Sequence, residues 1–293
     1  MSWPLAGLAM GQQGAWVARE LDLDDAGAPA QFVPTQAAVG HSKPVDRTAI
    51  AAALLAFREA DQQRYATRLG YAQTEAADQL LLTDPFAFLL GVLLDEGIPA
   101  ERAWQGPYEL RARLGHLDPQ QIRYDLRSVS AAVDTQPKLH RFVDVMARAI
   151  VAAADRVCRE YDGDAAQIWS PGSTAAEVDA RLRAFDKIGP KKAAMAVELL
   201  VSHFGVELEE LSGSNVAYDV HVRRVFLRTG LVDRDSINEV TRAARELWPE
   251  RPGLLDLPTW LIGRQWCHSA NPTCSTCPLG QVCPRLTERN LGY

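Results

Sequence analysis

Apolar residues recur along most of the chain at the three- and four-residue spacing of an amphipathic helix. One such run extends from 46 to about 69 and carries Ile50, Leu54 and Phe57 on one face. Another begins after Asp84, a capping residue followed directly by proline, which is the usual start of a helix. Further helices are expected near 99–104, 106–114, 118–122, 137–160, 174–185, 190–204, 219–229, 234–247 and 257–266.

The strongest run, Phe86 to Leu94, is apolar almost all round, so we expect a central, buried helix there. Runs with the two-residue alternation of strands are nearly absent, and no repeat typical of a solenoid is present. The pattern therefore predicts an all-α protein. Residues 1–45 are rich in Gly, Ala, Pro and Gln, and we treat them as an N-terminal extension of unknown role.

The amino-acid composition narrows the class of protein to which the chain can belong. The chain has 293 residues, of which 47% are hydrophobic and 23% charged, an ordinary globular balance that excludes a disordered chain. No apolar stretch approaches the ~20 residues of a membrane span. Residues 1–12 lack the basic segment and continuous apolar core of a signal peptide, so we expect a cytoplasmic protein.

Net charge argues against a simple nucleic-acid binder. The chain carries 31 Lys and Arg against 37 Asp and Glu, a formal net charge of −6, whereas such binders are usually basic. Any DNA contact must therefore come from a local patch. Residues 181–192 supply one, because they hold five basic side chains and one acid.

That basic segment joins two predicted helices through a very short turn. Ile188 offers an apolar anchor, Gly189 a flexible backbone, and Pro190 suits the first position of the second helix. The free backbone N–H groups of such a helix start form an anion site, where a phosphate could dock without reading sequence. The alternative is a plain corner between helices with solvated lysines, including Lys187 and Lys192.

Lys191 lies in the first turn of the second helix. The positive end of the helix dipole disfavours an ammonium there, and partial burial would favour the neutral amine further. A neutral amine is a nucleophile. The alternative is an ordinary surface lysine.

A second helix start carries a carboxylate. Asp219 is well placed to cap the helix that follows, and a carboxylate fixed in this way can also act as a general base or stabilise a cation. Arg224 and Arg228 share another face of that helix and could meet phosphates. The alternative reading of Asp219 is a cap and nothing more.

Four of the five cysteines gather near the C-terminus, as Cys267-x6-Cys274-x2-Cys277-x5-Cys283. Because a cytoplasmic chain rarely keeps disulfides, this group predicts a metal or cluster site, with a disulfide-bonded loop as a distant alternative. Zinc sites usually combine two C-x2-C pairs from separate places. One such pair with two flanking cysteines on wider arcs favours a [4Fe–4S] cluster over structural zinc.

These three features, in this order, resemble the endonuclease III branch of the helix-hairpin-helix DNA glycosylases. The resemblance covers about residues 80–286 and is most specific in the cysteine spacing. It implies two helical domains that flank a DNA cleft: a six-helix barrel at 81–213 with its hairpin at 185–192, and a [4Fe–4S] domain formed by 46–80 and 214–293.

By the same resemblance, Lys191 matches the Schiff-base lysine and Asp219 the catalytic aspartate. Lys187, Ile188, Gly189, Lys192 and Arg224 are expected to contact DNA, and Cys267, Cys274, Cys277 and Cys283 to hold the cluster. The implied partner is double-stranded DNA, bound by a monomer at the nucleoid with the target nucleotide flipped into the cleft.

The sequence departs from the family pattern at the hairpin and in the site. Lys187 stands where the family hairpin has its first glycine, and the interval from Lys191 to Asp219 is longer than usual. Gly97 stands at the place of the glutamine that commonly fills the gap left by the flipped base.

The leading hypothesis is a DNA glycosylase with abasic-site lyase activity. Two alternatives are a monofunctional uracil or thymine-mismatch glycosylase and a DNA-structure-binding protein without catalysis.

Overall fold

The structure is a computed structural model that describes residues 45–65 and 72–288, with side chains from 45 to 60 and from 72 to 288. The prediction of an all-α protein is confirmed, because this part of the chain contains helices and no strand. The elements are α1 (Arg47–Tyr65), α2 (Glu75–Thr83), α3 (Pro85–Leu94), α4 (Ala100–Leu114), α5 (Pro119–Ile122), α6 (Leu126–Asp134), α7 (Val143–Glu160), η1 (Ala165–Trp169), α8 (Ala175–Arg183), α9 (Pro190–His203), α10 (Val220–Arg228), α11 (Ile237–Leu247), η2 (Pro252–Leu255) and α12 (Asp256–Gln265). The extension expected at residues 1–45 falls, but for its last residue, outside the described residues.

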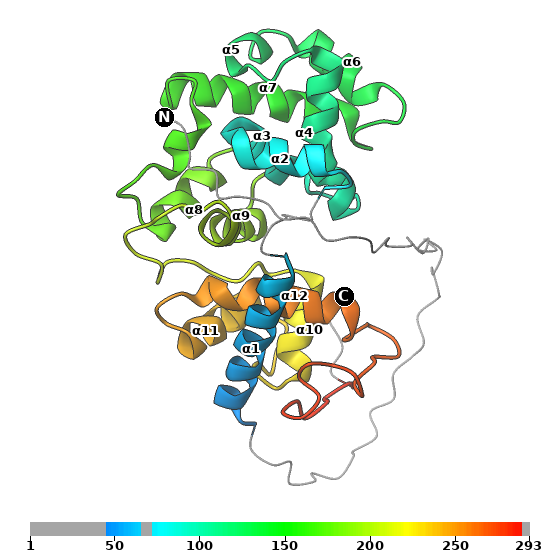
Figure 1. Cartoon of the computed structure of the whole chain (residues 1–293), viewed down its shortest axis with the longest axis vertical. Coiled ribbons are helices and arrows are strands. Elements are labelled where there is room, and N and C mark those ends of the chain that lie inside the picture. Colours follow the sequence, from blue (N-terminus) through cyan, green and yellow to red (C-terminus); the bar gives the residue numbers. More distant parts are fainter. Residues whose placement is uncertain (1–44, 66–71, 289–293) are drawn as a thin grey trace. The chain divides into compact units, whose positions relative to one another are not determined.

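The first hydrophobic core is built around α3. Every residue from Phe86 to Leu94 is buried, as the unbroken apolar run predicts. The helix begins where expected, because the Asp84 carboxylate accepts hydrogen bonds from the backbone N–H groups of Phe86 and Ala87. Helices α2, α4, α7 and α9 pack against α3, and Figure 1 shows them grouped about it.

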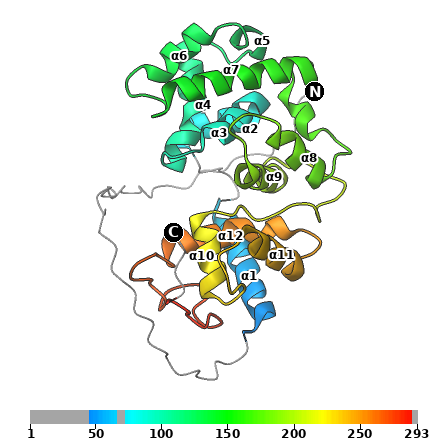
Figure 2. The same cartoon turned by 180° about the vertical axis from the view of Figure 1, so that it is seen from behind.

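The second core joins an early helix to the end of the chain. Ile50 and Leu54 of α1 pack with Val225 and Phe226 of α10 and with Leu279 of the C-terminal loop. Helices α1, α10, α11 and α12 gather in both views (Figures 1 and 2). The two cores belong to one unit, residues 44–293.

A buried ionic cluster connects the two cores. Glu198 of α9 is 3% exposed, and its carboxylate accepts from Arg251 at 2.8 and 3.2 Å, from Arg58 at 3.3 Å and from Ser202 at 2.6 Å. Two guanidinium groups and a hydroxyl satisfy this carboxylate, so its burial is compensated.

The structure differs from the expected helices at α2, α4, α6 and α7. The segments 99–104 and 106–114 form one helix, α4, with Pro107 inside it. Helices α2 and α6 were not expected, and α7 begins at Val143 rather than near 137. No single described helix is long and apolar enough to cross a membrane.

His203, at the end of α9, should make the fold sensitive to acid. Burial, with a smaller contribution from the Arg58 charge, lowers its pKa to about 4 from an ordinary value near 6.5. The unfolded chain therefore binds more protons than the folded one between these values, and stability falls as pH drops through that window. Between pH 7 and pH 5 the loss from this one group is about 2 kcal/mol.

The His203→Gln variant should lose less stability than the wild type over the same pH step, measured by urea unfolding at both values. His116→Gln, which removes an imidazole elsewhere, is the control. Equal losses in the wild type and His203→Gln would contradict this account.

Candidate functional site

The turn between α8 and α9 presents the basic segment. Phe185 and Ile188 are buried in the first core and anchor the turn at both ends. Lys187 between them has a φ of 68°, in the left-handed region that glycine adopts most readily. The hairpin therefore keeps the backbone conformation of a glycine with a lysine in its place.

Glu96, just beyond the end of α3, binds two hairpin lysines. Its carboxylate lies 2.8 Å from Lys187 Nζ and 3.4 Å from Lys192 Nζ. Burial opposes ionisation, but the hydrogen bonds and charges of the two lysines outweigh it and lower the pKa of Glu96. The ion pair with Lys187 offsets part of the cost of the left-handed turn, which is about 1 kcal/mol for a non-glycine residue.

Lys192 departs from the expected phosphate contact. The residue is 6% exposed, and Nζ donates to the backbone carbonyl of Leu93 at 2.8 Å as well as to Glu96. Burial lowers the pKa of Lys192. This lysine fastens the start of α9 to the end of α3, and Ile188, also buried, offers only its backbone to a ligand.

Lys191, one residue earlier, is exposed, so the partial burial expected for it is not found. Gly189 is exposed too, and no side chain caps α9. The first-turn N–H groups of this fourteen-residue helix are thus open to an anion, as expected of the hairpin.

Asp219 begins α10 as the sequence predicts. Its Oδ1 atom accepts from the backbone N–H groups of His221 and Val222, each at 2.8 Å, which fixes the carboxylate at the helix start. The side chain is 9% exposed. The charges of Asp219 and Lys191 both act on the carboxyl groups of Asp95 and Asp256.

Asp256, the first residue of α12, holds the backbone segment that precedes Asp219. Its carboxyl group accepts from the backbone N–H of Ala217 at 2.6 Å and so holds the segment that leads into Asp219. Burial raises the pKa of Asp256 well above its usual range. It therefore has the character of a buried hydrogen-bonding group rather than a freely ionised one.

Arg224 also departs from the expected phosphate contact. The side chain is 5% exposed, and its guanidinium donates to the carbonyls of Cys267 at 2.6 Å and Gly263 at 2.9 Å and contacts His221 Nδ1 at 3.0 Å. Arg228, one turn on, donates to the carbonyls of His268 and Ser269 at 2.6 and 2.9 Å. Both arginines hold the cysteine loop against α10.

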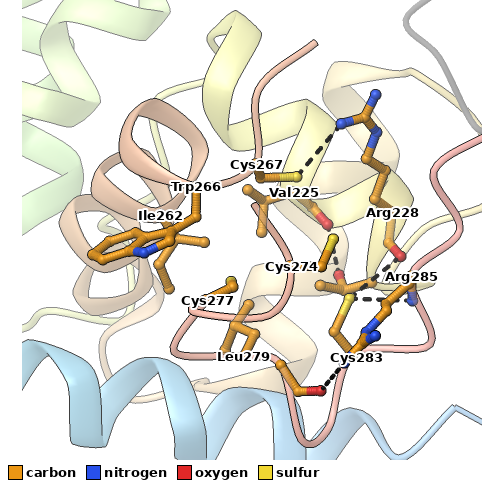
Figure 3. A pocket seen from close by; sticks show the side chains of 12 residues that line it. Val225, Arg228, Ile262, Trp266, Cys267, Cys274, Cys277, Leu279, Cys283 and Arg285 are labelled. Atoms are coloured by element: carbon orange, nitrogen blue, oxygen red, sulfur yellow. Dashed lines mark hydrogen bonds between the residues drawn. The ribbon is translucent and has the colours of Figure 1, made fainter. Parts of the chain in front are cut away.

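The four clustered cysteines line one cavity (Figure 3). Val225, Ile262 and Leu279 form its apolar wall, and two basic residues, Arg228 and Arg285, lie at it as well. The backbone N–H of Arg285 donates to Cys283 Sγ at 3.3 Å, and Arg228 Nη1 lies 3.7 Å from Cys267 Sγ. The loop thus provides sulfur ligands together with donors that stabilise negative sulfur.

The four cysteines are the donor set that this cavity offers to a metal centre. No three His, Cys, Asp or Glu side chains of the described residues converge closely enough to hold one metal ion, yet four thiols surround one cavity. A zinc ion needs four ligands about 2.0–2.3 Å from one point, whereas a [4Fe–4S] cube takes one thiolate at each of its irons. Burial raises the pKa of Cys277 and of Cys283, and the neighbouring thiols add to the rise.

No protein family profile and no curated protein sequence matches this chain. Solved structures do match it. A trapped endonuclease III–DNA covalent intermediate superposes with a TM-score of 0.59 at 18% identity, over 84% of this chain and 99% of that one. The chain has the endonuclease III fold. A thermostable thymine-DNA glycosylase has it too, with a TM-score of 0.58 at 15% identity, over 83% of this chain and 97% of that one.

The sequence analysis missed several groups around the hairpin. Asp95, Glu96 and Asp256 all act on its lysines, and Glu198 connects the two cores. One signal was present in the sequence. Asp95 and Glu96 follow the last residue of α3, the negative end of a helix dipole, where acids are unfavourable unless something compensates them.

Proposed function

We propose that the chain is a base-excision-repair DNA glycosylase that removes a damaged or mismatched base from duplex DNA and then cleaves the abasic site as a lyase. One observation carries the proposal: an exposed lysine at a helix start, Lys191, shares its electrostatic surroundings with a carboxylate fixed at another helix start, Asp219. The fold, found in a trapped endonuclease III–DNA covalent intermediate and in a thymine-DNA glycosylase, supports it.

The chemistry follows from the two side chains. The neutral amine of Lys191 attacks C1′ of the target nucleotide as the bond to the base breaks. The carboxylate of Asp219 is fixed in place by the backbone N–H groups that donate to it. It therefore stabilises the positive charge that develops on the sugar more than it stabilises the ground state. The imine that results allows β-elimination of the 3′ phosphate. The target must leave the base stack for its C1′ atom to come within reach of Lys191.

DNA binding is local and electrostatic in this proposal. Lys187 and the N–H groups that follow Gly189 contact phosphates, and these contacts position the duplex without reading its sequence. The net charge of −6 opposes binding, because the rest of the chain repels the DNA backbone, so the affinity must come from these local contacts. A protein of this kind would act at the nucleoid.

Replacing Lys187 with glycine tests this patch. Glycine adopts the left-handed turn without strain, and the ion pair that it loses is partly exposed, so the melting temperature should change by only a few degrees. DNA affinity should fall, and the slope of log K against log salt should become smaller by about 0.9. Fluorescence anisotropy over a range of salt measures both.

Arg159→Ala is the matched control, because it removes one exposed cation from α7, away from the hairpin in sequence. If both variants change affinity and salt slope equally, Lys187 has no contact of its own with DNA.

We further propose that Cys267, Cys274, Cys277 and Cys283 hold a [4Fe–4S] cluster. The support is that the four thiols line one cavity and that Arg228 and Arg285 lie beside them. When bound, the cluster supplies a rigid, charged centre for the loop. The thiolates fix the loop, and Arg224 and Arg228 transmit its position to α10 and hence to Asp219.

Cys274→Ser should lower the iron content from about four atoms per chain and bleach the brown colour of anaerobically purified protein. DNA affinity and solubility should fall with it, because the loop surface loses its support. Cys158→Ser, which changes the one cysteine outside the loop, should keep both iron and colour. One zinc and no iron in the wild type would contradict the cluster.

The deciding experiment presents the wild type with a panel of duplexes, each holding one damaged or mismatched base, and adds borohydride during the reaction. Base release with a trapped protein–DNA adduct supports the glycosylase and lyase together. Base release without trapping indicates the monofunctional alternative. Binding without release on any duplex indicates a DNA-structure-binding protein.

A further inference from the structure

Phe142, at the start of α7, exposes its aromatic ring beside an arginine. The residue is 40% exposed, and the guanidinium of Arg141 lies 4.6 Å from the centre of its ring. Arg141 is exposed as well, and its side chain makes no hydrogen bond or ion pair with the described residues. Because a guanidinium over a ring still has N–H donors at its edge, the pair presents an apolar ring and unused donors on one surface.

The same arginine lies against the turn that follows α3. Gly97 has no side chain, and a Cβ atom built on it would stand only 2.9 Å from Nη2 of Arg141. The guanidinium therefore occupies the space that a side chain at this position would fill. Arg141 thus packs against both the ring of Phe142 and the backbone turn at Gly97.

Buried His140 fastens the pair to the end of α3. Its Nε2 atom lies 2.7 Å from the carbonyl oxygen of Glu96, and its Nδ1 atom lies 3.1 Å from the backbone nitrogen of Phe142. Since a carbonyl only accepts and a backbone N–H only donates, the ring is a neutral imidazole with its proton on Nε2. The carboxylate of the same Glu96 binds Lys187, a proposed phosphate contact. Glu96 therefore connects the exposed pair to the hairpin.

An opened duplex offers a ligand that suits this pair. Flipping the target nucleotide leaves its partner base without a pairing neighbour and partly unstacked. Unpaired bases stack on aromatic rings and on guanidinium planes, and their exposed edges accept hydrogen bonds from N–H donors. Phe142 supplies the ring, and Arg141 supplies the plane and the donors.

We propose that Arg141 and Phe142 form a binding site for the unpaired partner base of the flipped nucleotide. The inference rests on the proposed function and deepens it, because it assigns the residues that hold the duplex open while Lys191 acts. Through Glu96 the site lies beside Lys187, so neighbouring parts of one surface make the base contact and the phosphate contact. A site of this kind favours opened over paired DNA, because a paired base is stacked and its edge is occupied.

The test compares two duplexes of the same sequence by fluorescence anisotropy, one fully paired and one with a tetrahydrofuran abasic analogue opposite a thymine. The proteins are the full-length wild type, Phe142→Ala, Phe142→Tyr and Arg141→Lys, with circular dichroism as a check of each fold. Tyr124→Ala is the matched control, because Tyr124 is also an exposed ring, with the guanidinium of Arg123 lying 4.7 Å from its centre. That arginine is paired with Asp155.

The wild type should bind the opened duplex more tightly than the paired one. Phe142→Ala should reduce this preference about tenfold, within the usual effect of removing one stacking ring, and Phe142→Tyr should keep it. Arg141→Lys keeps the charge and loses the plane. It should therefore keep the affinity for paired DNA and its salt dependence but lose about fivefold of the preference. Tyr124→Ala should keep the wild-type preference.

Permanganate oxidation of the thymine opposite the analogue gives a second readout, which does not depend on affinity. Permanganate attacks the C5–C6 double bond of a thymine that is not stacked, so a thymine stacked on Phe142 is protected. At saturating protein, this thymine should react more slowly in the wild-type complex than in the Phe142→Ala complex.

A wild type that releases base but has no preference for the opened duplex would overturn the inference and leave the glycosylase standing. So would an unchanged preference in both Phe142→Ala and Arg141→Lys, or an equal loss of affinity for the two duplexes, which indicates a structural role. A wild type that binds neither duplex and releases no base would reject the proposed function itself. If Phe142→Ala does not fold, Arg141→Lys, which leaves the ring in place, carries the same comparison.

Discussion

Lys191→Gln should abolish borohydride trapping and strand cleavage at abasic sites, a loss on the order of 10⁴-fold or more. An imine requires a primary amine within reach of C1′, and glutamine has none. The side chain is exposed at the first turn of α9 and makes no hydrogen bond or ion pair with the described residues, so its replacement should leave the melting temperature unchanged. The affinity for a duplex with an uncleavable abasic analogue should fall by no more than the loss of one phosphate contact would cause.

Lys187→Gln is the matched control for this variant. It removes a hairpin cation four residues away, weakens binding and should keep trapping, because Lys187 pairs with Glu96 and not with the groups around Lys191. Lys192 is unsuitable as a control, since its amine is buried against Leu93 and its loss would disturb the hairpin itself. Persistent trapping by Lys191→Gln would mean that another amine reaches the sugar.

The features that the sequence predicts are those set by local chemistry. An aspartate before an apolar run caps a helix wherever the run lies, so Asp84 and Asp219 occupy the expected positions. The four cysteines within 267–283 line one cavity because residues on so short a loop stay close together in space. The all-α class follows from the spacing of apolar residues alone.

What the sequence misses depends on contacts between distant segments. Pro107 signals a break, but α4 continues through it because the surrounding residues pack tightly, with Gly106 close against Leu94 of α3. Arg224 has the spacing of a surface cation, yet carbonyls some forty residues further along the chain bury it. A charged side chain is buried only where hydrogen-bonding groups surround it. Segments distant in the sequence supply those groups, so only the folded chain shows them.

The candidate site also combines residues that sequence motifs mark with residues that only the fold brings to it. Its two proposed reacting groups come from motifs that a reader of the sequence can find, Lys191 after the hairpin and Asp219 before α10. The groups that tune them come from α3 and α12, where no motif marks them. Asp256 is recognisable only once its carboxyl group is seen to hold Ala217, two residues before Asp219.

Asp219→Asn should lower the rate of base release by about 10³-fold while leaving the fold and DNA affinity nearly intact. Asparagine is as good a helix cap as aspartate, and its side-chain oxygen can accept from His221 and Val222 as the carboxylate does. The variant therefore removes a negative charge and little else. Single-turnover kinetics on the preferred duplex measure the loss.

The control for Asp219→Asn is Asp84→Asn, the same change at the cap of α3, where two backbone N–H groups are held in the same way. It should release base at the wild-type rate, so a shared loss would point to capping rather than catalysis.

Base release and formation of the trapped adduct should also be separable in Asp219→Asn. Because a preformed abasic site has no base to expel, Asp219→Asn should still form the trapped adduct there through Lys191, more slowly but measurably. Wild-type base release by Asp219→Asn would remove this carboxylate from the mechanism.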